Sequence, residues 1–146
     1  MTEPTFLATP SVGRACGLWL ATVGLGTFFI TLFFVSIGGG AESPGLALIV
    51  GAIAAAFSLP ALLVLPIGIK WALAGDTAGA RYLRLLGLIT GLFGLAMLGC
   101  YLVFAANGGV ADPLVTITQF ASPYYVAALL AAYWLYRDWF RTPTYE

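Results

Sequence analysis

The chain has 146 residues, of which 61% are hydrophobic and only 8% are charged, and its formal net charge is zero. A soluble domain of this size leaves a large fraction of its side chains at the surface, so water would meet much of this apolar material. The composition therefore excludes an ordinary soluble domain and predicts one all-α membrane domain over residues 1–146. Because the sequence has no block of basic residues, nucleic acid is not an expected partner.

Four long segments contain no Asp, Glu, Lys or Arg: 15–41, 43–69, 85–111 and 113–136. A helix that spans a bilayer needs about 20 mostly apolar residues, so each segment holds one span and a short turn. A β-barrel would need strands of about 10 residues with alternating polarity, and these segments do not alternate. We expect an up-down bundle of four transmembrane helices, at 15–37, 44–73, 82–106 and 113–140.

The boundaries of these segments carry residues that end and begin helices. Glycine-rich sequences at 38–40 and 107–109 favour turns after the first and third helices. Pairs of a capping residue and a proline, at 43–44 and 112–113, open the second and fourth helices. The first segment is longer than the 7–15-residue apolar core of a signal peptide, so we expect it to be a retained span.

The basic residues predict the orientation of the bundle. Glu42 and Asp112 lie in the connections on one side of this topology, where no Lys or Arg is found. Lys and Arg are enriched on the cytoplasmic side of membrane proteins, so both termini are expected to be cytoplasmic. We expect a multi-pass protein of the cell membrane, specifically a bacterial inner membrane. The basic residues, all on the other side, are Arg14, Lys70, Arg81, Arg84, Arg137 and Arg141.

The two helical hairpins carry a faint repeat. When Arg14 is aligned with Arg84, Gly17 falls on Gly87, and Gly24 on Gly94 in the same register. Both hairpins cross the membrane in the same direction, which would relate them by a twofold axis along the membrane normal. Small residues are common in membrane helices, so chance matches are the alternative explanation.

Small residues also form stripes at spacings of three and four, which places them on one face of a helix. Such faces allow two helix backbones to approach closely in a membrane. The favoured interpretation is an internal seam of the bundle, and the alternative is a face that docks another subunit. The stripes are Gly17, Ala21 and Gly24 in the first helix and Gly87, Gly91 and Gly94 in the third.

The sequence has few residues that carry chemistry. Histidine is absent, and no CxxC motif, glycine-rich phosphate loop or catalytic triad is found. No charged residue lies near the middle of a predicted span, which argues against proton-coupled transport. We expect no metal, no cofactor and no enzymatic activity. An intramembrane enzyme was the least favoured alternative, because only Cys100, Tyr101 and the region of Gln119 offer reactive groups.

Proline interrupts the second and fourth helices, and each proline leaves the carbonyl four residues earlier without its usual donor. One interpretation is a hinge and a pocket between these two helices for a neutral or lipid-like molecule. The other is that both are ordinary kinks, which membrane helices tolerate. The candidate residues are Ser58, Pro60 and Pro66 in the second helix and Gln119, Ser122, Pro123 and Tyr124 in the fourth.

Two functions fit these observations. The first is a non-enzymatic interaction protein, an accessory subunit of a larger membrane complex, because the chain combines small-residue faces with no catalytic constellation. The alternative is a small homo-oligomeric transporter or channel for an uncharged or lipid-like solute. The expected partners are the lipid bilayer and either other membrane subunits or further copies of the chain.

Overall fold

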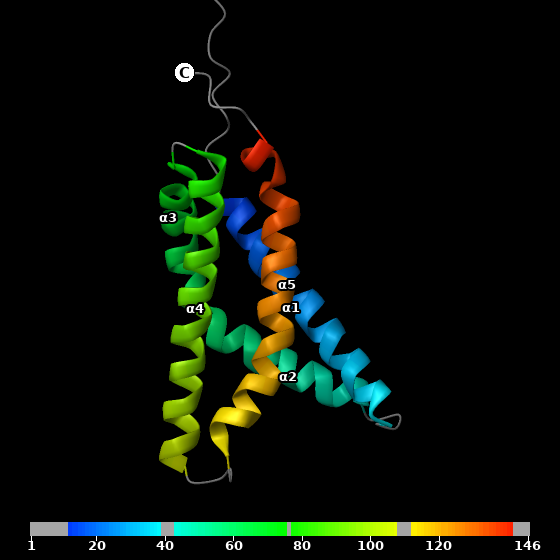
Figure 1. The fold of residues 1–146 in the computed structure, drawn as a ribbon. Coiled ribbons are helices and arrows are strands. Elements are labelled where there is room, and N and C mark those ends of the chain that lie inside the picture. The colour runs from blue at the N-terminus through cyan, green and yellow to red at the C-terminus, as the bar shows by residue number, and fades with distance from the viewer. Residues whose placement is uncertain (1–11, 39–42, 76, 108–111, 142–146) are drawn as a thin grey trace, which may run out of the picture.

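A computed structural model of the chain describes residues 12–38, 43–75, 77–107 and 112–141. The structure over these ranges consists of helices and turns, with no strand. The expected all-α fold is therefore confirmed for this part of the chain. Five helices follow one another (Figure 1): α1 (Val12–Ser36), α2 (Ser43–Ser58), α3 (Ala61–Leu73), α4 (Ala78–Asn107) and α5 (Pro113–Arg141).

Three of these helices, α1, α4 and α5, are long and apolar enough to cross a membrane. The shorter α2 and α3 meet the same test together and add a fourth span if they are counted as one broken segment. Lipid solvates the outer faces of such helices, and large apolar side chains are accordingly exposed on them, for example Leu63 at 79% and Ile67 at 72%. The chain is thus a multi-pass membrane protein by the length and composition of its helices.

The second expected helix, 44–73, is broken rather than continuous. Its two halves, α2 and α3, are bent by 64° at the turn formed by Leu59 and Pro60. Proline has no N–H to continue the helical ladder, and the amide of Leu62 instead donates to the carbonyl of Leu59 at 3.0 Å, a tighter turn than the α-helix. The sequence predicted a kink or tilt here, and the structure has an interruption.

Two of the expected boundary signals act as predicted. Gly38, directly after α1, has a φ of 82°, a conformation that other residues rarely adopt. Asp112 precedes α5, and its Oδ1 accepts a hydrogen bond from the amide of Val115 at the long distance of 3.5 Å. The remaining glycines of these turns, at 39–40 and 108–109, lie outside the described residues.

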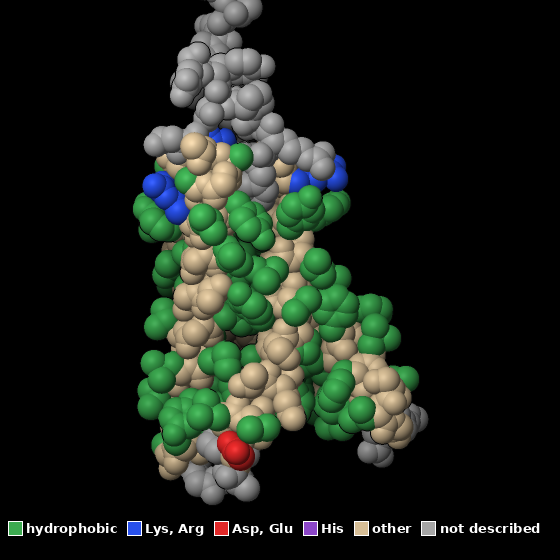
Figure 2. Space-filling view, viewed as in Figure 1, with side chains coloured by type: hydrophobic (Ala, Val, Ile, Leu, Met, Phe, Trp, Pro, Cys, Tyr) green, Lys and Arg blue, Asp and Glu red, His purple; other side chains and the backbone are tan. Residues whose placement is uncertain are grey.

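Figure 1 shows α4 standing along the long axis of the molecule, α3 beside it, and α2 slanting away from α3 toward the far tip of α1. The helix α1 packs mainly against α5 and α2, whereas α4 packs against α5 and α3. The end at which α1 and α4 begin and α3 and α5 end carries the Lys and Arg side chains in Figure 2. We call it the basic end; its described basic residues are Arg14, Lys70, Arg81, Arg84 and Arg137.

The buried residues form two clusters. The larger one joins α1, α3, α4 and α5 and includes Leu18, Ile69, Leu85 and the fully buried Tyr136. The smaller one joins α1, α2 and α5 around Ile30, Ala47 and Tyr124. Since α2 belongs only to the smaller cluster and α3 only to the larger one, the break at Pro60 lets one segment serve both.

Candidate functional site

The hydroxyl of Ser58 ties the end of α2 to α1. Its Oγ donates to the carbonyl of Ala54 at 2.7 Å and accepts a hydrogen bond from the indole N–H of Trp19 at 2.9 Å. Unpaired polar groups are costly in the apolar part of a membrane, so a bond between two side chains here stabilises the close approach of α1 and α2. The partner of Ser58 is therefore a residue of α1, and Trp19 had not been assigned to the site from the sequence.

The two prolines of this segment differ in effect. Pro60 lies exposed in the turn between α2 and α3, where its φ and ψ of −59° and −28° already suit the helix that follows. Pro66 lies half-buried inside α3, which continues through it. The break in this segment thus lies at Pro60, whereas Pro66 does not interrupt α3.

Tyr124 is buried, with 5% of its surface exposed, and it faces α1. Its hydroxyl lies 3.2 Å from Oγ1 of Thr27, whose own hydroxyl donates to the carbonyl of Val23 at 2.8 Å. A threonine hydroxyl has one hydrogen, so Tyr124 is the donor in this pair. The ring lies directly over Gly26, where any Cβ would overlap it.

The same threonine also meets α2. A Cβ built at Gly51 would lie 2.5 Å from Oγ1 of Thr27, so glycine is required for this approach. Gly26, Thr27, Gly51 and Tyr124 together form a joint between α1, α2 and α5, which we call the three-helix joint. Contacts at this joint run through α1.

Gln119 and Ser122 are exposed on the part of α5 that lies far from the basic end. The hydroxyl of Ser122 donates to the carbonyl of Gln119 at 3.3 Å. This is the carbonyl that Pro123 leaves without its usual donor, so the serine compensates for the proline locally. Among the hydrogen bonds of the described residues, none joins Ser58 to Gln119, Ser122 or Tyr124. Of the predicted pocket residues, Ser58 and Tyr124 thus bond to α1, whereas Gln119 and Ser122 lie on an exposed surface.

The predicted glycine stripe of α4 faces away from its neighbours. A Cβ added at Gly87, Gly91 or Gly94 would meet no atom of another described element within 4 Å, and all three positions are exposed. On other sides of the helix, Leu88 packs against Gly68 of α3, and Thr90 lies 2.9 Å from the Tyr125 hydroxyl of α5. The stripe therefore makes no seam within the described chain.

The stripe of α1 is divided. Ala21 packs against the larger cluster, whereas Gly17 and Gly24 have open space over them. Of the described glycines inside helices, those in tight contact are Gly26, Gly51 and Gly68. Gly68 and Ala72 are small residues four positions apart, and this spacing is a signal in the sequence that would have identified Gly68 as a packing glycine.

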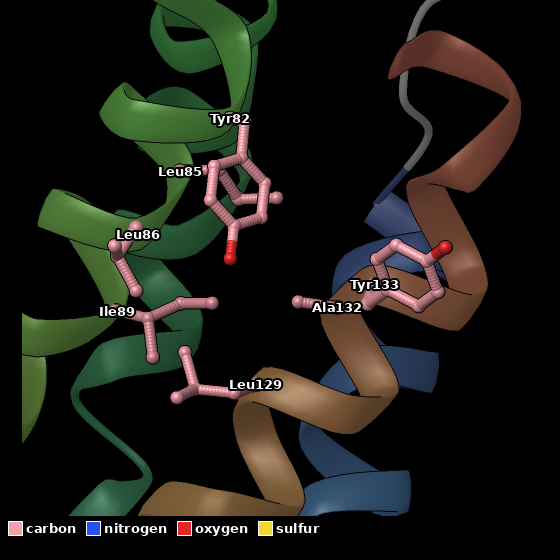
Figure 3. Close-up of a pocket in the computed structure, with 7 residues that line it drawn as sticks. All are labelled: Tyr82, Leu85, Leu86, Ile89, Leu129, Ala132 and Tyr133. Carbon is pink, nitrogen blue, oxygen red and sulfur yellow. The ribbon is translucent and has the colours of Figure 1, made fainter. Parts of the chain in front are cut away.

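A cavity opens between α4 and α5, in the half of the molecule nearer the basic end (Figure 3). It encloses about 30 Å³ and had not been predicted from the sequence. Its walls are mostly apolar, and the residues that line it are Tyr82, Leu85, Leu86, Ile89, Leu129, Ala132 and Tyr133.

Groups suited to metal binding or redox chemistry are sparse in the described ranges. Three or more His, Cys, Asp or Glu residues do not come together there in an arrangement that would hold a metal ion. Cys16 and Cys100 are free thiols. The fully buried hydroxyl of Tyr136 has no hydrogen-bond partner among the described residues.

Comparison of the chain with models of protein families, with curated proteins and with solved structures finds no match.

Proposed function

We propose that the chain is a non-enzymatic membrane protein that serves as an interaction subunit of a larger membrane complex. The observation that supports this proposal is the outward glycine face of α4, made of Gly87, Gly91 and Gly94. In lipid, close backbone contact is a main source of helix association, so glycines on a lipid-exposed face are useful mainly to a second helix.

The surroundings of the glycine face match such a role. Leu83, Leu95 and Leu98 are exposed beside it, at 66%, 68% and 53%. A shallow strip between large side chains accepts the ridge of a neighbouring helix and allows close packing. We therefore propose a partner that is itself a transmembrane helix with small residues on one side, contributed by another subunit or by a second copy of the chain.

We further propose four spans, with α2 and α3 as one broken span and both termini in the cytoplasm. The described Lys and Arg side chains lie at one end of the bundle, where α1 begins and α5 ends (Figure 2). Positively charged residues favour the cytoplasmic side, which supports this orientation in the inner membrane of a bacterium. Cysteines replacing Arg84 and Asp112 should then be labelled from opposite sides of a sealed vesicle, and labelling from one side would exclude this topology.

The interaction proposal is tested by purifying the full chain from its own membranes in a mild detergent. We expect wild type to co-purify with a partner or as an oligomer, and Gly91→Leu to release it, because leucine would hold the two backbones apart. Gly24→Leu is the matched control, since Gly24 is also exposed with open space over it, but on α1. A wild-type chain that runs alone as a monomer, or equal release by both variants, would refute the proposal.

A homo-oligomeric transporter or channel for an uncharged or lipid-like solute is the second candidate. It is supported by the exposure of Gln119 and Ser122, which in an oligomer would line a polar path between copies rather than within one. In known transporters, broken helices form solute sites, and α2 and α3 together make a broken helix of this kind. Cysteines at positions 119 and 122, in a chain without Cys16 and Cys100, should react with a water-soluble thiol reagent. Leu130→Cys, in the apolar part of α5, is the control that should resist the reagent. If the cysteines at 119 and 122 resist it equally, this candidate fails.

A further inference from the structure

The cavity between α4 and α5 is small and open to the side of the bundle. Its volume of about 30 Å³ is far below the several hundred Å³ of a usual small-molecule pocket. Figure 3 shows the side chains of Leu85 and Ile89 on one wall pointing toward Ala132 and Leu129 on the other. An occupant must therefore be slender, apolar, and mostly outside the protein.

The cavity exists because a small residue faces large ones. Ala132 is buried opposite Leu85 and Ile89, and its short side chain leaves the space between the two helices unfilled. Leu129 closes the end nearer the middle of the molecule. The result is a short groove that runs along the bundle in the direction in which acyl chains run in a bilayer.

Two tyrosine rings flank the other end of the groove. Tyr82 and Tyr133 stand on its two walls, each about half exposed (Figure 3). Tyrosine is enriched at the membrane–water interface, because its ring is apolar and its hydroxyl is polar. In this structure the Tyr82 hydroxyl points along the groove toward the middle of the molecule and the Tyr133 hydroxyl points away from it, so the two rings mark the interfacial end of the groove (Figure 3).

A basic side chain follows Tyr133 on the same helix. Arg137 comes one helical turn after Tyr133 and so lies on the same side of α5, nearer the basic end. Its Nε is 3.6 Å from Oδ1 of the adjacent Asp138, but both side chains are exposed, and such a pair contributes little. Because the described residues of this end carry more Lys and Arg than Asp and Glu, an anionic head group is favoured over a neutral one.

We propose that this groove is a binding site for one anionic phospholipid, with an acyl chain between α4 and α5 and the phosphate beside Arg137. A protein helix fits less well, because a cavity of about 30 Å³ is too small to receive a large side chain from a second helix. The groove and the glycine face lie on different sides of α4, so this site does not depend on the proposed interaction function.

The test uses the full chain in detergent and native mass spectrometry, with phosphatidylglycerol and phosphatidylcholine of identical acyl chains as probes. We expect phosphatidylglycerol to be retained about fivefold better, the preference that one basic side chain provides at an anionic lipid surface. Arg137→Gln should remove this preference. Lys70→Gln is the matched control, because Lys70 is exposed at the same end but outside the groove.

Filling the groove should lower the retention of both lipids. Ala132→Val occupies the space from the α5 side, and Leu86→Trp covers it from α4 should the first variant fail to fold. Ala105→Val, at an exposed position of α4 far from the basic end, should leave retention unchanged. The proposal would be overturned if wild type retained both lipids equally, or if Lys70→Gln and Arg137→Gln had equal effects. Unchanged retention in a folded groove variant would also overturn it. A wild-type dimer that Ala132→Val abolishes would identify a second copy as the occupant and would overturn it as well.

Discussion

The hydroxyl of Tyr124 lies 3.2 Å from Oγ1 of Thr27, and this pair joins α5 to α1 in the part of the bundle where α2 also packs. The approach depends on two glycines. Gly26 leaves room for the tyrosine ring, and Gly51 leaves room for the threonine. The hydrogen bond between Tyr124 and Thr27 and the absence of a Cβ at both glycines therefore act together to hold these helices close.

We expect Tyr124→Phe and Thr27→Val each to destabilise the fold, because each removes one partner of a buried hydrogen bond. Such pairs contribute about 0.6 kcal/mol on average in membrane proteins and up to about 1.7. The free energy of unfolding in mixed micelles, measured for both variants and the double variant, should show a coupling of this size. Thr31→Val is the control, because among the described residues its hydroxyl bonds only to the carbonyl of Thr27 in its own helix. Strict additivity of the two changes would contradict the bond.

Glycine 26 should tolerate no side chain. Gly26→Ala places a Cβ against the ring of Tyr124, and overpacking of this kind costs about 1–3 kcal/mol. Gly24→Ala lies two residues away with open space over it, so it should be neutral or stabilising, since alanine favours a helix by about 1 kcal/mol over glycine. Thermal unfolding of the two variants is the measurement, and an equal response of both would show that the ring does not lie over Gly26.

Replacing Pro60 should straighten the segment formed by α2 and α3. Pro60→Ala restores an N–H that can join the two helices into one ladder. Spin labels at the exposed positions Leu48 and Ile67, in a chain without native cysteines, should move apart by about 4 Å at a rise of 1.5 Å per residue. Pro66→Ala is the matched control, because α3 already continues through Pro66. An unchanged distance in Pro60→Ala would mean that packing alone holds the bend.

Tyr136→Phe should leave stability unchanged or raise it. The hydroxyl of Tyr136 is fully buried and has no partner within the described part of the chain, so its removal relieves a desolvation cost of about 1–3 kcal/mol while the ring keeps its contacts. The same substitution at Tyr124 should destabilise, which makes the pair a matched comparison of bonded and unbonded hydroxyls. A loss of stability in Tyr136→Phe, seen by unfolding in mixed micelles, would reveal a partner for this hydroxyl.

Much of the fold follows from local features of the sequence. The charge-free segments predicted apolar helices, and α1, α4 and α5 meet that expectation. Gly38 and Asp112 mark helix ends by their own backbone and side-chain preferences. These features are local, because a bilayer makes each helix satisfy its own backbone hydrogen bonds whatever its neighbours are.

The candidate site was less accessible to sequence reasoning. Prolines at 60, 66 and 123 look alike in the sequence, but only Pro60 separates two helices, and Ser58, two residues before it, is bonded to Trp19 of another helix. The lipid groove arises from Ala132 facing Leu85 and Ile89, which are far away along the chain. Neither relationship is encoded in the spacing of residues on one helix.

The glycines show most clearly what the sequence determines and what only the packing of the helices decides. Spacing alone placed Gly87, Gly91 and Gly94 on one face of a helix, and helical geometry guarantees that result. Whether a face meets another helix depends on how α1, α3, α4 and α5 pack together, and the structure turns this face outward while pressing Gly26, Gly51 and Gly68 against neighbours. The sequence by itself determined helices, their ends and their apolar character, because these depend on the solvent and the nearest residues. Only the tertiary structure decided which small residues carry contacts, because a contact requires two surfaces that come from different parts of the chain.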